Sequence, residues 1–163
     1  GRDRLRSMIL VHQQLYRATD LSRLDFADYV RSLVHELMAS HGATQRGISV
    51  RVEAEPLSLP IDRALPCGMV VAELLTNSFK YAFPDGRRGH ADVCVRRRNG
   101  DFQLSVRDDG VGLPVGFESH DFGSFGWQLI RSLARQVGAS IEIDRERGTC
   151  VSFTVPLSAE PQP

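Results

Sequence analysis

The sequence predicts an α+β fold, a two-layer sandwich in which helices cover one face of a mixed β-sheet of about five strands. Three observations support this class. Helical and strand-like periodicities both occur along the chain, the strand-like segments come in pairs, and helices separate the pairs instead of following every strand. The length of 163 residues suits one domain, and 42% hydrophobic residues are enough for a sizeable core.

Four segments repeat apolar residues at the 3–4-residue spacing of one helical face. We expect these helices at 4–17, 25–41, 62–83 and 126–137, with the last three on one face of the sheet. Asp25 is a plausible N-cap of the second helix, and Gly42 ends it. Asp62 is the expected cap of the third helix, with Pro66 tolerated in its first turn, and Gly138 closes the fourth.

The strand-like segments alternate apolar and polar side chains. They are expected at 48–52, 90–98, 101–108, 141–143 and 151–155. Asn99-Gly100, between two of them, is a strong signal for a tight hairpin. Residues 110–125 are rich in glycine and are expected to form a loop. The tail at 158–163 has no apolar cluster to bury and is expected to be disordered.

Composition limits the classes of partner. Lys+Arg and Asp+Glu both number 20, so no overall field favours nucleic acid or anionic lipid, and any phosphate site must be local. No apolar run approaches the ~18 residues that span a bilayer, and no signal peptide opens the chain. The chain begins in helical pattern, which indicates a fragment of a parent that could carry a membrane anchor. Cys67, Cys94 and Cys150 are expected to be reduced core thiols, which suits a cytoplasmic domain.

The helix expected at 62–83 has two different faces. Glu73, Asn77 and Lys80 follow one another at i, i+4 and i+7 and form a narrow polar stripe. This stripe is either a solvated face or a ligand-facing one. In the second case an Asn carbonyl oxygen suits Mg²⁺, a Glu can accept a proton and a Lys can neutralise phosphate charge. The opposite side, which is expected to pack on the sheet, carries Val71, Leu74, Leu75, Ser78 and Ala82.

Two glycine-containing segments follow. Asp108-Asp109-Gly110-Val111-Gly112 ends a strand whose apolar face also carries Asp108, so this carboxylate is expected to be buried. A buried carboxylate needs a partner, either its own turn or a ligand amine such as that of adenine. Gly123-Ser124-Phe125-Gly126 leads into a helix and is either an ordinary helix start or an anion site. Gly148-Thr149 is either a hairpin turn or a place where a hydroxyl lines a ring pocket.

Together and in this order, the segments at 73–82, 108–112, 123–126 and 148–149 resemble the N box, the two glycine boxes and the terminal Gly-Thr element of sensor histidine kinases. The resemblance covers residues 46–157 and places the chain with the Bergerat-fold ATPases. It implies an ATP pocket and a mobile lid at 113–125. It also implies a catalytic role for Glu73, a Mg²⁺ ligand at Asn77 and an adenine-binding role for Asp108. The other residues that it implies in cofactor binding are Lys80, Tyr81, Gly110, Gly112, Gly126 and Thr149.

The N-terminal part, at 8–20 and 24–29, resembles a histidine kinase subclass with variant dimerisation helices, which are often coupled to light or ligand sensors. This implies three parts. Residues 1–20 would be the end of a dimerisation helix with its connector, residues 21–157 the ATP-binding catalytic domain, and residues 158–163 a tail. His12 lacks the context of a phosphoacceptor and is expected to be a packed histidine.

The function implied by the resemblance is transfer of the γ-phosphoryl group of MgATP to a histidine outside this chain. The implied partners are that histidine in the protein's own dimerisation domain and a response regulator, with a homodimer only when the dimerisation helices are complete. Ser124 replaces the usual first glycine of the second box, and Phe125 and Trp127 are bulky. A nucleotide-binding module without turnover therefore stays open, as does a serine kinase of the anti-sigma-factor type, although the helix at 4–17 argues against the latter.

Overall fold

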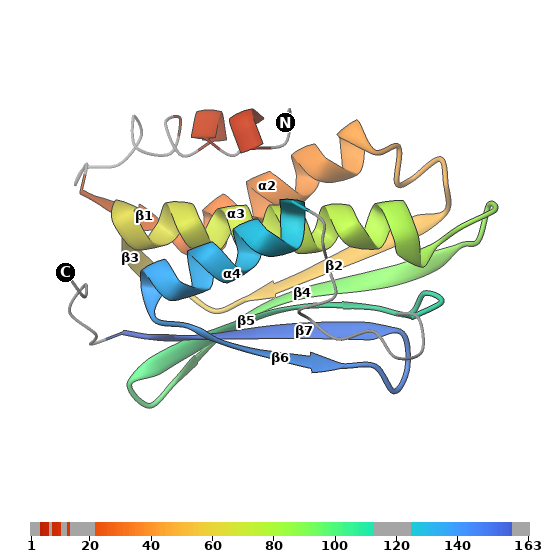
Figure 1. Cartoon of the computed structure of the whole chain (residues 1–163). Coiled ribbons are helices and arrows are strands. Elements are labelled where there is room, and N and C mark those ends of the chain that lie inside the picture. The colour runs from red at the N-terminus through yellow and green to blue at the C-terminus, as the bar shows by residue number, and fades with distance from the viewer. Residues whose placement is uncertain (1–3, 7, 11–12, 14–21, 113–124, 158–163) are drawn as a thin grey trace.

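The computed structural model describes residues 4–6, 8–10, 13, 22–112 and 125–157. Three helices lie side by side on one face of a five-stranded sheet, as predicted (Figure 1). The N-terminal residues that are described are helical and lie on the far side of this helical layer from the sheet (Figure 1). The elements are β1 (Arg23–Asp25), α2 (Phe26–Ser40), β2 (Ile48–Ala54), β3 (Ser58–Pro60), α3 (Ile61–Asn77), η1 (Ser78–Ala82), β4 (Gly89–Arg98), β5 (Asp101–Asp108), α4 (Phe125–Val137), β6 (Ser140–Asp144) and β7 (Thr149–Pro156).

The sheet has the strand order β2-β4-β5-β7-β6. β2 pairs with β4 in parallel and the other neighbours are antiparallel, which confirms the mixed sheet. The hairpin at Asn99-Gly100 is also confirmed, because Arg98 pairs with Asp101 and Gly100 has φ +77°. Side chains that alternate along the strands point either to the helices or away from them. On the central strands most of the helix-facing side chains are apolar and buried, as at Phe102, Leu104 and Phe153.

A second, two-stranded sheet joins β1 to β3 and has no counterpart among the predicted strands. Each of its strands has three residues, which is too short for side-chain alternation to be recognised. Leu24 and Leu59 pair directly and are both buried, so this small sheet closes one end of the core.

α2 follows its prediction closely. The Asp28 backbone N–H donates to Asp25 Oδ1 at 3.1 Å, which confirms Asp25 as the N-cap. The helix ends at Ser40, and Gly42 has φ +61°, a conformation that glycine adopts without strain. The N-terminal helix is confirmed only at 4–6, 8–10 and 13, because the rest of 4–17 lies outside the described residues. The tail at 158–163 and the loop at 113–124 also lie outside them.

The predicted start of the third helix is confirmed to within one residue, but its predicted cap was wrong. α3 begins at Ile61 with Pro60 as its N-cap, so Asp62 lies within the first turn and caps nothing. The reason is local, because β3 runs directly into the helix and Pro60, with φ −57° and ψ 150°, already has the extended conformation of a cap residue. The earlier start also puts Pro66 in the second turn, where its ring is buried.

The end of the same helix departs from the prediction in a more informative way. The α-helix stops at Asn77, and Ser78–Ala82 form a π-helix, η1. Single π-turns cost hydrogen-bond geometry and occur often at functional sites. One side-chain and one backbone donor outside the helix bind its carbonyl oxygens: Arg46 Nη2 donates to Phe79 O at 2.7 Å, and Val111 N donates to Ala82 O at 2.9 Å. The π-turn therefore lies between two loops that are distant in sequence.

The sheet-facing side of this helix is confirmed, since all five of its residues are buried: Val71, Leu74, Leu75, Ser78 and Ala82. All three cysteines are free, as expected, and Cys67 and Cys150 are buried, but Cys94 is only partly buried and lies outside the core. Within the described part of the chain, we find no helix that is both long enough and apolar enough to cross a membrane.

Candidate functional site

Asp108 is the buried acid at the centre of the candidate site. It is the last residue of β5, it faces the helices and only 5% of it is exposed. Ser78 Oγ donates to Asp108 Oδ2 at 2.8 Å, and the Gly110 backbone N–H donates to Oδ1 at 3.1 Å. The burial predicted for Asp108 is thus confirmed. Its two partners belong to this chain, yet each carboxylate oxygen can accept a second hydrogen bond.

Thr149 lies beside this acid. The β5–β7 register pairs Asp108 directly with Thr149, and residues that are directly opposite on antiparallel strands point to the same face. Thr149 is partly buried. A carboxylate and a hydroxyl therefore stand together at one end of a sheet face that is otherwise apolar. Such an arrangement offers hydrogen-bond acceptors and a donor to a flat, mostly apolar ring with polar edges.

Glycines allow the backbone to close tightly around this pair. A Cβ on Gly110 would collide with the carbonyl oxygen of Ala82 in η1, and one on Gly148 would collide with the carbonyl oxygen of Asp108. Gly112 lies against Gly148, with a Cβ position 3.4 Å from the Gly148 carbonyl oxygen. Residues 108–112, the acidic glycine turn, are thus packed between the π-helix and the start of β7. No larger residue fits at the two closest approaches.

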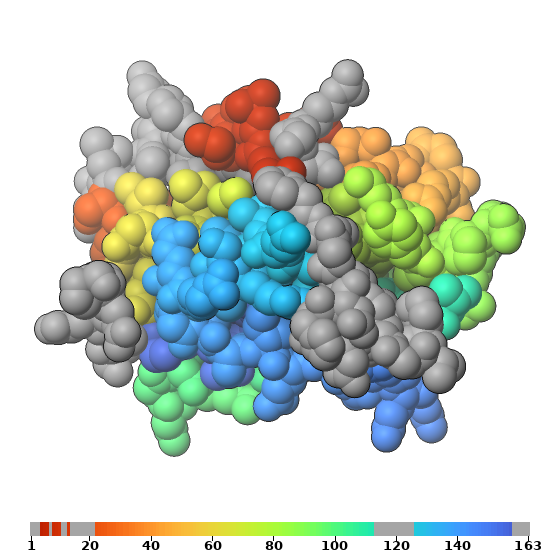
Figure 2. Space-filling view, viewed as in Figure 1, coloured from red at the N-terminus to blue at the C-terminus, as the bar shows by residue number. Residues whose placement is uncertain are grey.

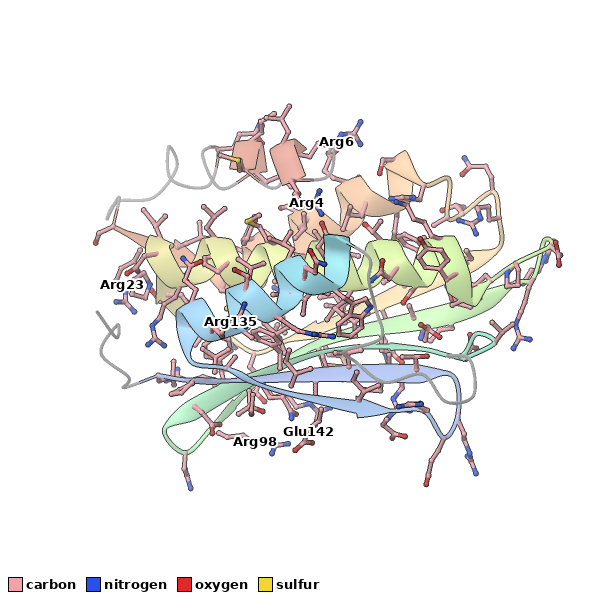
Figure 3. All side chains as sticks on the ribbon, in the orientation of Figure 1. Arg4, Arg6, Arg23, Arg98, Arg135 and Glu142 are labelled. Atoms are coloured by element: carbon pink, nitrogen blue, oxygen red, sulfur yellow. The ribbon has the colours of Figure 1, made fainter. Side chains whose placement is uncertain are left out.

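Glu73 lies where three helices meet. Its side chain is 12% exposed, and its Oε1 forms an ion pair with Arg4 Nη2 at 2.6 Å. Its Oε2 is 2.9 Å from the position that a Cβ on Gly126 would occupy, so the carboxylate lies against the first turn of α4. Figure 3 shows Arg4 extending from the N-terminal helix toward α3 and α4. In the space-filling view, the described N-terminal residues, drawn in red, lie on the outer side of the helical layer (Figure 2).

The predicted polar stripe crosses from α3 into η1. Glu73 and Asn77 are both partly buried on α3, whereas Lys80 and Tyr81 lie in η1 and are exposed, Tyr81 by 69%. A spacing of 100° per residue holds for an α-helix and not for a π-helix, so Lys80 is offset from the position that the α-helical pattern assumed. A common ligand-facing role for the three side chains stays a prediction. Among the described residues, no group of three His, Cys, Asp or Glu side chains is placed to hold a metal ion.

Of the second glycine segment, Gly123 and Ser124 lie outside the described residues, as does most of the predicted lid. Gly126 is the second residue of α4, so the predicted helix start is confirmed to within one residue. Trp127 is buried, and its bulk contributes to the core.

Three residues of the site had no predicted role. Ser78 was expected only as a sheet-facing residue, Arg46 was not considered, and Arg4 was part of a helical pattern. Each makes its contact with a residue at least thirty positions away. A serine on the buried face of a helix can indicate a hydrogen bond to an inward-pointing acid of the sheet below. This indication becomes usable only once the topology places the two elements together.

Comparisons with known proteins agree with this geometry. The family model described as "Histidine kinase-, DNA gyrase B-, and HSP90-like ATPase" matches residues 63–159, and one described as "Histidine kinase" matches residues 1–41. The blue-light-activated histidine kinase 2 of Erythrobacter litoralis is 31% identical over 115 residues, which cover 69% of this chain and 33% of that protein. The sensor histidine kinase PdtaS of Mycobacterium tuberculosis is 31% identical over 163 residues, covering 94% of this chain and 31% of that protein. The chain thus spans about a third of the length of these curated relatives.

Solved structures give the same picture. The histidine kinase domain of the Erythrobacter litoralis EL346 blue-light-activated histidine kinase superposes with a TM-score of 0.87 at 25% identity, covering 96% of this chain and 74% of that one. The catalytic domain of the histidine kinase ThkA gives a TM-score of 0.70 at 20% identity, over 85% of this chain and 97% of that one. The second likeness shows the fold alone.

Proposed function

Because this chain belongs to the family of histidine kinase-, DNA gyrase B- and HSP90-like ATPases, we propose that it is the catalytic domain of a sensor histidine kinase and binds ATP beside Asp108. One observation carries the proposal: a buried carboxylate, a neighbouring hydroxyl and two tightly packed glycine turns meet at one end of the sheet. The curated relatives and the similar structure with the higher TM-score are also histidine kinases.

The adenine end of the proposed site is formed by Asp108 and Thr149. The remaining lone pairs of Asp108 would accept hydrogen bonds from the exocyclic amine of adenine, and the Thr149 hydroxyl would assist. Gly110 and Gly112 would let the backbone approach the ring closely. The hydrogen bond from Ser78 supports this role, because it holds the carboxylate in one orientation before the ligand arrives.

The phosphate end is assigned to α3, η1 and the start of α4. The Asn77 amide oxygen would bind Mg²⁺, and phosphate oxygens and water would complete the coordination. Gly126 lies in the first turn of α4, where free backbone N–H groups and the helix dipole favour a phosphate. Lys80 and Tyr81 are exposed at the edge of η1 and would approach the nucleotide from solvent.

Chemistry at this site would be phosphoryl transfer to a histidine that the chain does not supply. Such reactions depend mostly on positioning and on charge neutralisation. Glu73, held between α3 and α4, would accept the proton of the incoming imidazole. In the same proposal, residues 1–20 end a dimerisation helix and residues 21–157 form the catalytic domain. The histidine kinase family model matches residues 1–41, so it covers the proposed dimerisation helix but also continues across the proposed boundary into α2. The parent protein would form a homodimer, act in the cytoplasm and pass its phosphoryl group to a response regulator.

Calorimetric titration with ADP and with a non-hydrolysable ATP analogue tests the binding site. We expect the wild-type chain to bind both with Mg²⁺ present and to prefer adenine over guanine nucleotides. Asn77→Ala should remove the Mg²⁺-dependent part of the affinity, and Asp108→Asn should remove the preference for adenine. If either variant binds like the wild type, its assignment is refuted.

A second experiment tests turnover. The chain is incubated with radioactive γ-labelled ATP and a separately produced dimerisation domain that carries a histidine phosphoacceptor. Transfer that gives an acid-labile product supports a histidine kinase, because phosphohistidine is sensitive to acid. An acid-stable product would indicate a serine kinase, and tight ATP binding without labelling would indicate a module without turnover.

A further inference from the structure

The π-helix η1 has an external support in the loop between α2 and β2, at residues 41–47. Arg46 Nη2 donates to the Phe79 carbonyl oxygen at 2.7 Å, across 33 positions of sequence. The His41 ring also lies 5.3 Å from the Phe79 ring, centroid to centroid. Phe79 is fully buried, so the loop holds one residue of η1 through both its backbone and its side chain.

The π-helical pattern of hydrogen bonds has no donor for this carbonyl. In a π-helix, the carbonyl of residue i accepts from the N–H of residue i+5, which for Phe79 is residue 84. Residue 84 is proline and has no N–H. The backbone also leaves the helix at Phe83, with φ −125° and ψ 63°. Because a buried carbonyl without a donor is costly, the Arg46 guanidinium supplies what Pro84 lacks.

The loop that carries Arg46 is itself fixed. Ala43 is fully buried, and its carbonyl oxygen accepts from the Ile48 N–H at 2.9 Å at the start of β2. The Gly89 N–H donates to the Gly47 carbonyl oxygen at 3.2 Å, which ties the loop to the start of β4. Arg46 therefore reaches η1 from a support that is anchored to two strands of the sheet.

The other side of η1 contacts the candidate site. Ser78 Oγ donates to Asp108 Oδ2 at 2.8 Å, and the Ala82 carbonyl oxygen accepts from Val111 N at 2.9 Å. Gly110 leaves no room for η1 to move closer. Any displacement of η1 therefore changes the position of Ser78 against Asp108 and the path of the acidic glycine turn.

We propose that Arg46 is a positioning residue for nucleotide binding, which acts through the Phe79 carbonyl and η1 to set the geometry of Ser78 and Asp108. This inference rests on the proposed function, in which Asp108 recognises adenine. Arg46 contacts Phe79, which is not among the residues proposed to bind the nucleotide. Its effect should therefore appear in the affinity for adenine nucleotides and in how well ordered the acidic glycine turn is.

The test compares Arg46→Met, which keeps a long apolar stem and removes the donors, with Arg46→Lys, which keeps a cationic donor. Arg88→Met is the matched control, because Arg88 is also exposed and its side chain runs over Gly47 of the same loop. We expect Arg46→Met to weaken ADP binding about tenfold and to reduce the preference for ADP over GDP. Arg46→Lys and Arg88→Met should stay within about threefold of the wild type.

Hydrogen exchange measured without nucleotide separates this inference from the proposed function. In Arg46→Met, the amide of Val111 and those of η1 should exchange at least tenfold faster, while amides of the β6–β7 hairpin should be unchanged. If the wild type binds no ADP but this local loosening occurs, the proposed function fails and the support by Arg46 stands.

Equal exchange and equal ADP affinity in Arg46→Met and Arg88→Met would overturn the inference. So would an affinity loss in Arg46→Met without any change in base preference. If Arg46→Met does not fold, wild-type affinity, base preference and Val111 exchange must persist in Arg46→Lys, and their loss there would also overturn it.

Discussion

Arg4 and Glu73 form an ion pair, with 2.6 Å between Arg4 Nη2 and Glu73 Oε1, that joins the N-terminal helix to α3. The two side chains are 26% and 12% exposed, so water screens the pair only in part. Glu73 is the proposed catalytic acid–base residue, and one of its carboxylate oxygens is occupied by a residue from outside the sheet domain. The position of the N-terminal helix and the state of Glu73 are therefore physically linked.

This link predicts a measurable coupling energy. Arg4→Gln and Glu73→Gln should each lower stability, and the double variant should be less destabilised than the sum of the two, with a coupling of about 1–2 kcal/mol. Urea unfolding of all four proteins closes the cycle. Arg6→Gln is the control, because Arg6 lies on the same helix and is partly exposed. Additive effects within about 0.3 kcal/mol would show that the ion pair contributes nothing.

The hydrogen bond between Ser78 and Asp108 predicts a local cost of its own. Ser78→Ala removes the donor and leaves a buried carboxylate with the Gly110 N–H as its remaining donor among the described residues, so we expect a loss of about 1.5–3 kcal/mol in unfolding free energy. ADP affinity should fall at the same time. Ser105→Ala, on the same sheet but on its outer face, should change stability by less than about 0.5 kcal/mol. Equal stability of the two variants would contradict the assigned bond.

Glycine substitutions can separate backbone strain from close packing. Gly148 and Gly100 both have φ +77°, but a Cβ on Gly148 would collide with the Asp108 backbone, whereas Gly100 has open space. We expect Gly100→Ala to cost about 1 kcal/mol from conformation alone and Gly148→Ala about 3 kcal/mol or more, with loss of nucleotide binding. Thermal unfolding and ADP titration of both variants measure this. Similar costs in the two would mean that the turn can relax away from Asp108.

Much of the fold could be predicted because its signals are local. Alternation along β4 and β5, the Asn99-Gly100 turn and the Asp25 cap each depend on a few neighbouring residues. The β1–β3 sheet was missed because three residues carry no period. The π-turn was missed because a backbone change after Asn77 leaves the apolar pattern almost intact, and Pro84 was its one local sign.

The features of the candidate site also divide into those that local patterns predict and those that depend on tertiary structure. The inward direction of Asp108 follows from strand alternation, but its pairing with Thr149 depends on the β5–β7 register, which periodicity could not indicate. The family resemblance implied only that both residues take part in cofactor binding. The contacts made by Arg4, Ser78 and Arg46 are tertiary, because each joins elements whose separation in space no local pattern encodes. These contacts also refine the predicted chemistry, since they show which groups hold Glu73 and Asp108 before any ligand is bound.

Burial of the Cys67 thiol in α3 predicts a pH-dependent contribution to stability. Burial raises the pKa of this thiol from 9.0 to about 12, with Arg63 opposing the shift. A folded-state pKa above the unfolded one means that the contribution is fully present below pH 9 and is lost as the pH rises from 9 through 12. The stability difference between the wild type and Cys67→Ala, measured in urea at pH 7, 9 and 10.5, should therefore shift toward the variant at the highest pH.

Other groups also titrate above pH 9, but they are common to both proteins and cancel in this difference. Cys94→Ala is the companion control, because Cys94 is only partly buried and should show a smaller shift. A difference for Cys67 that is constant over the whole range would mean that the thiol is not sealed from solvent in the folded state.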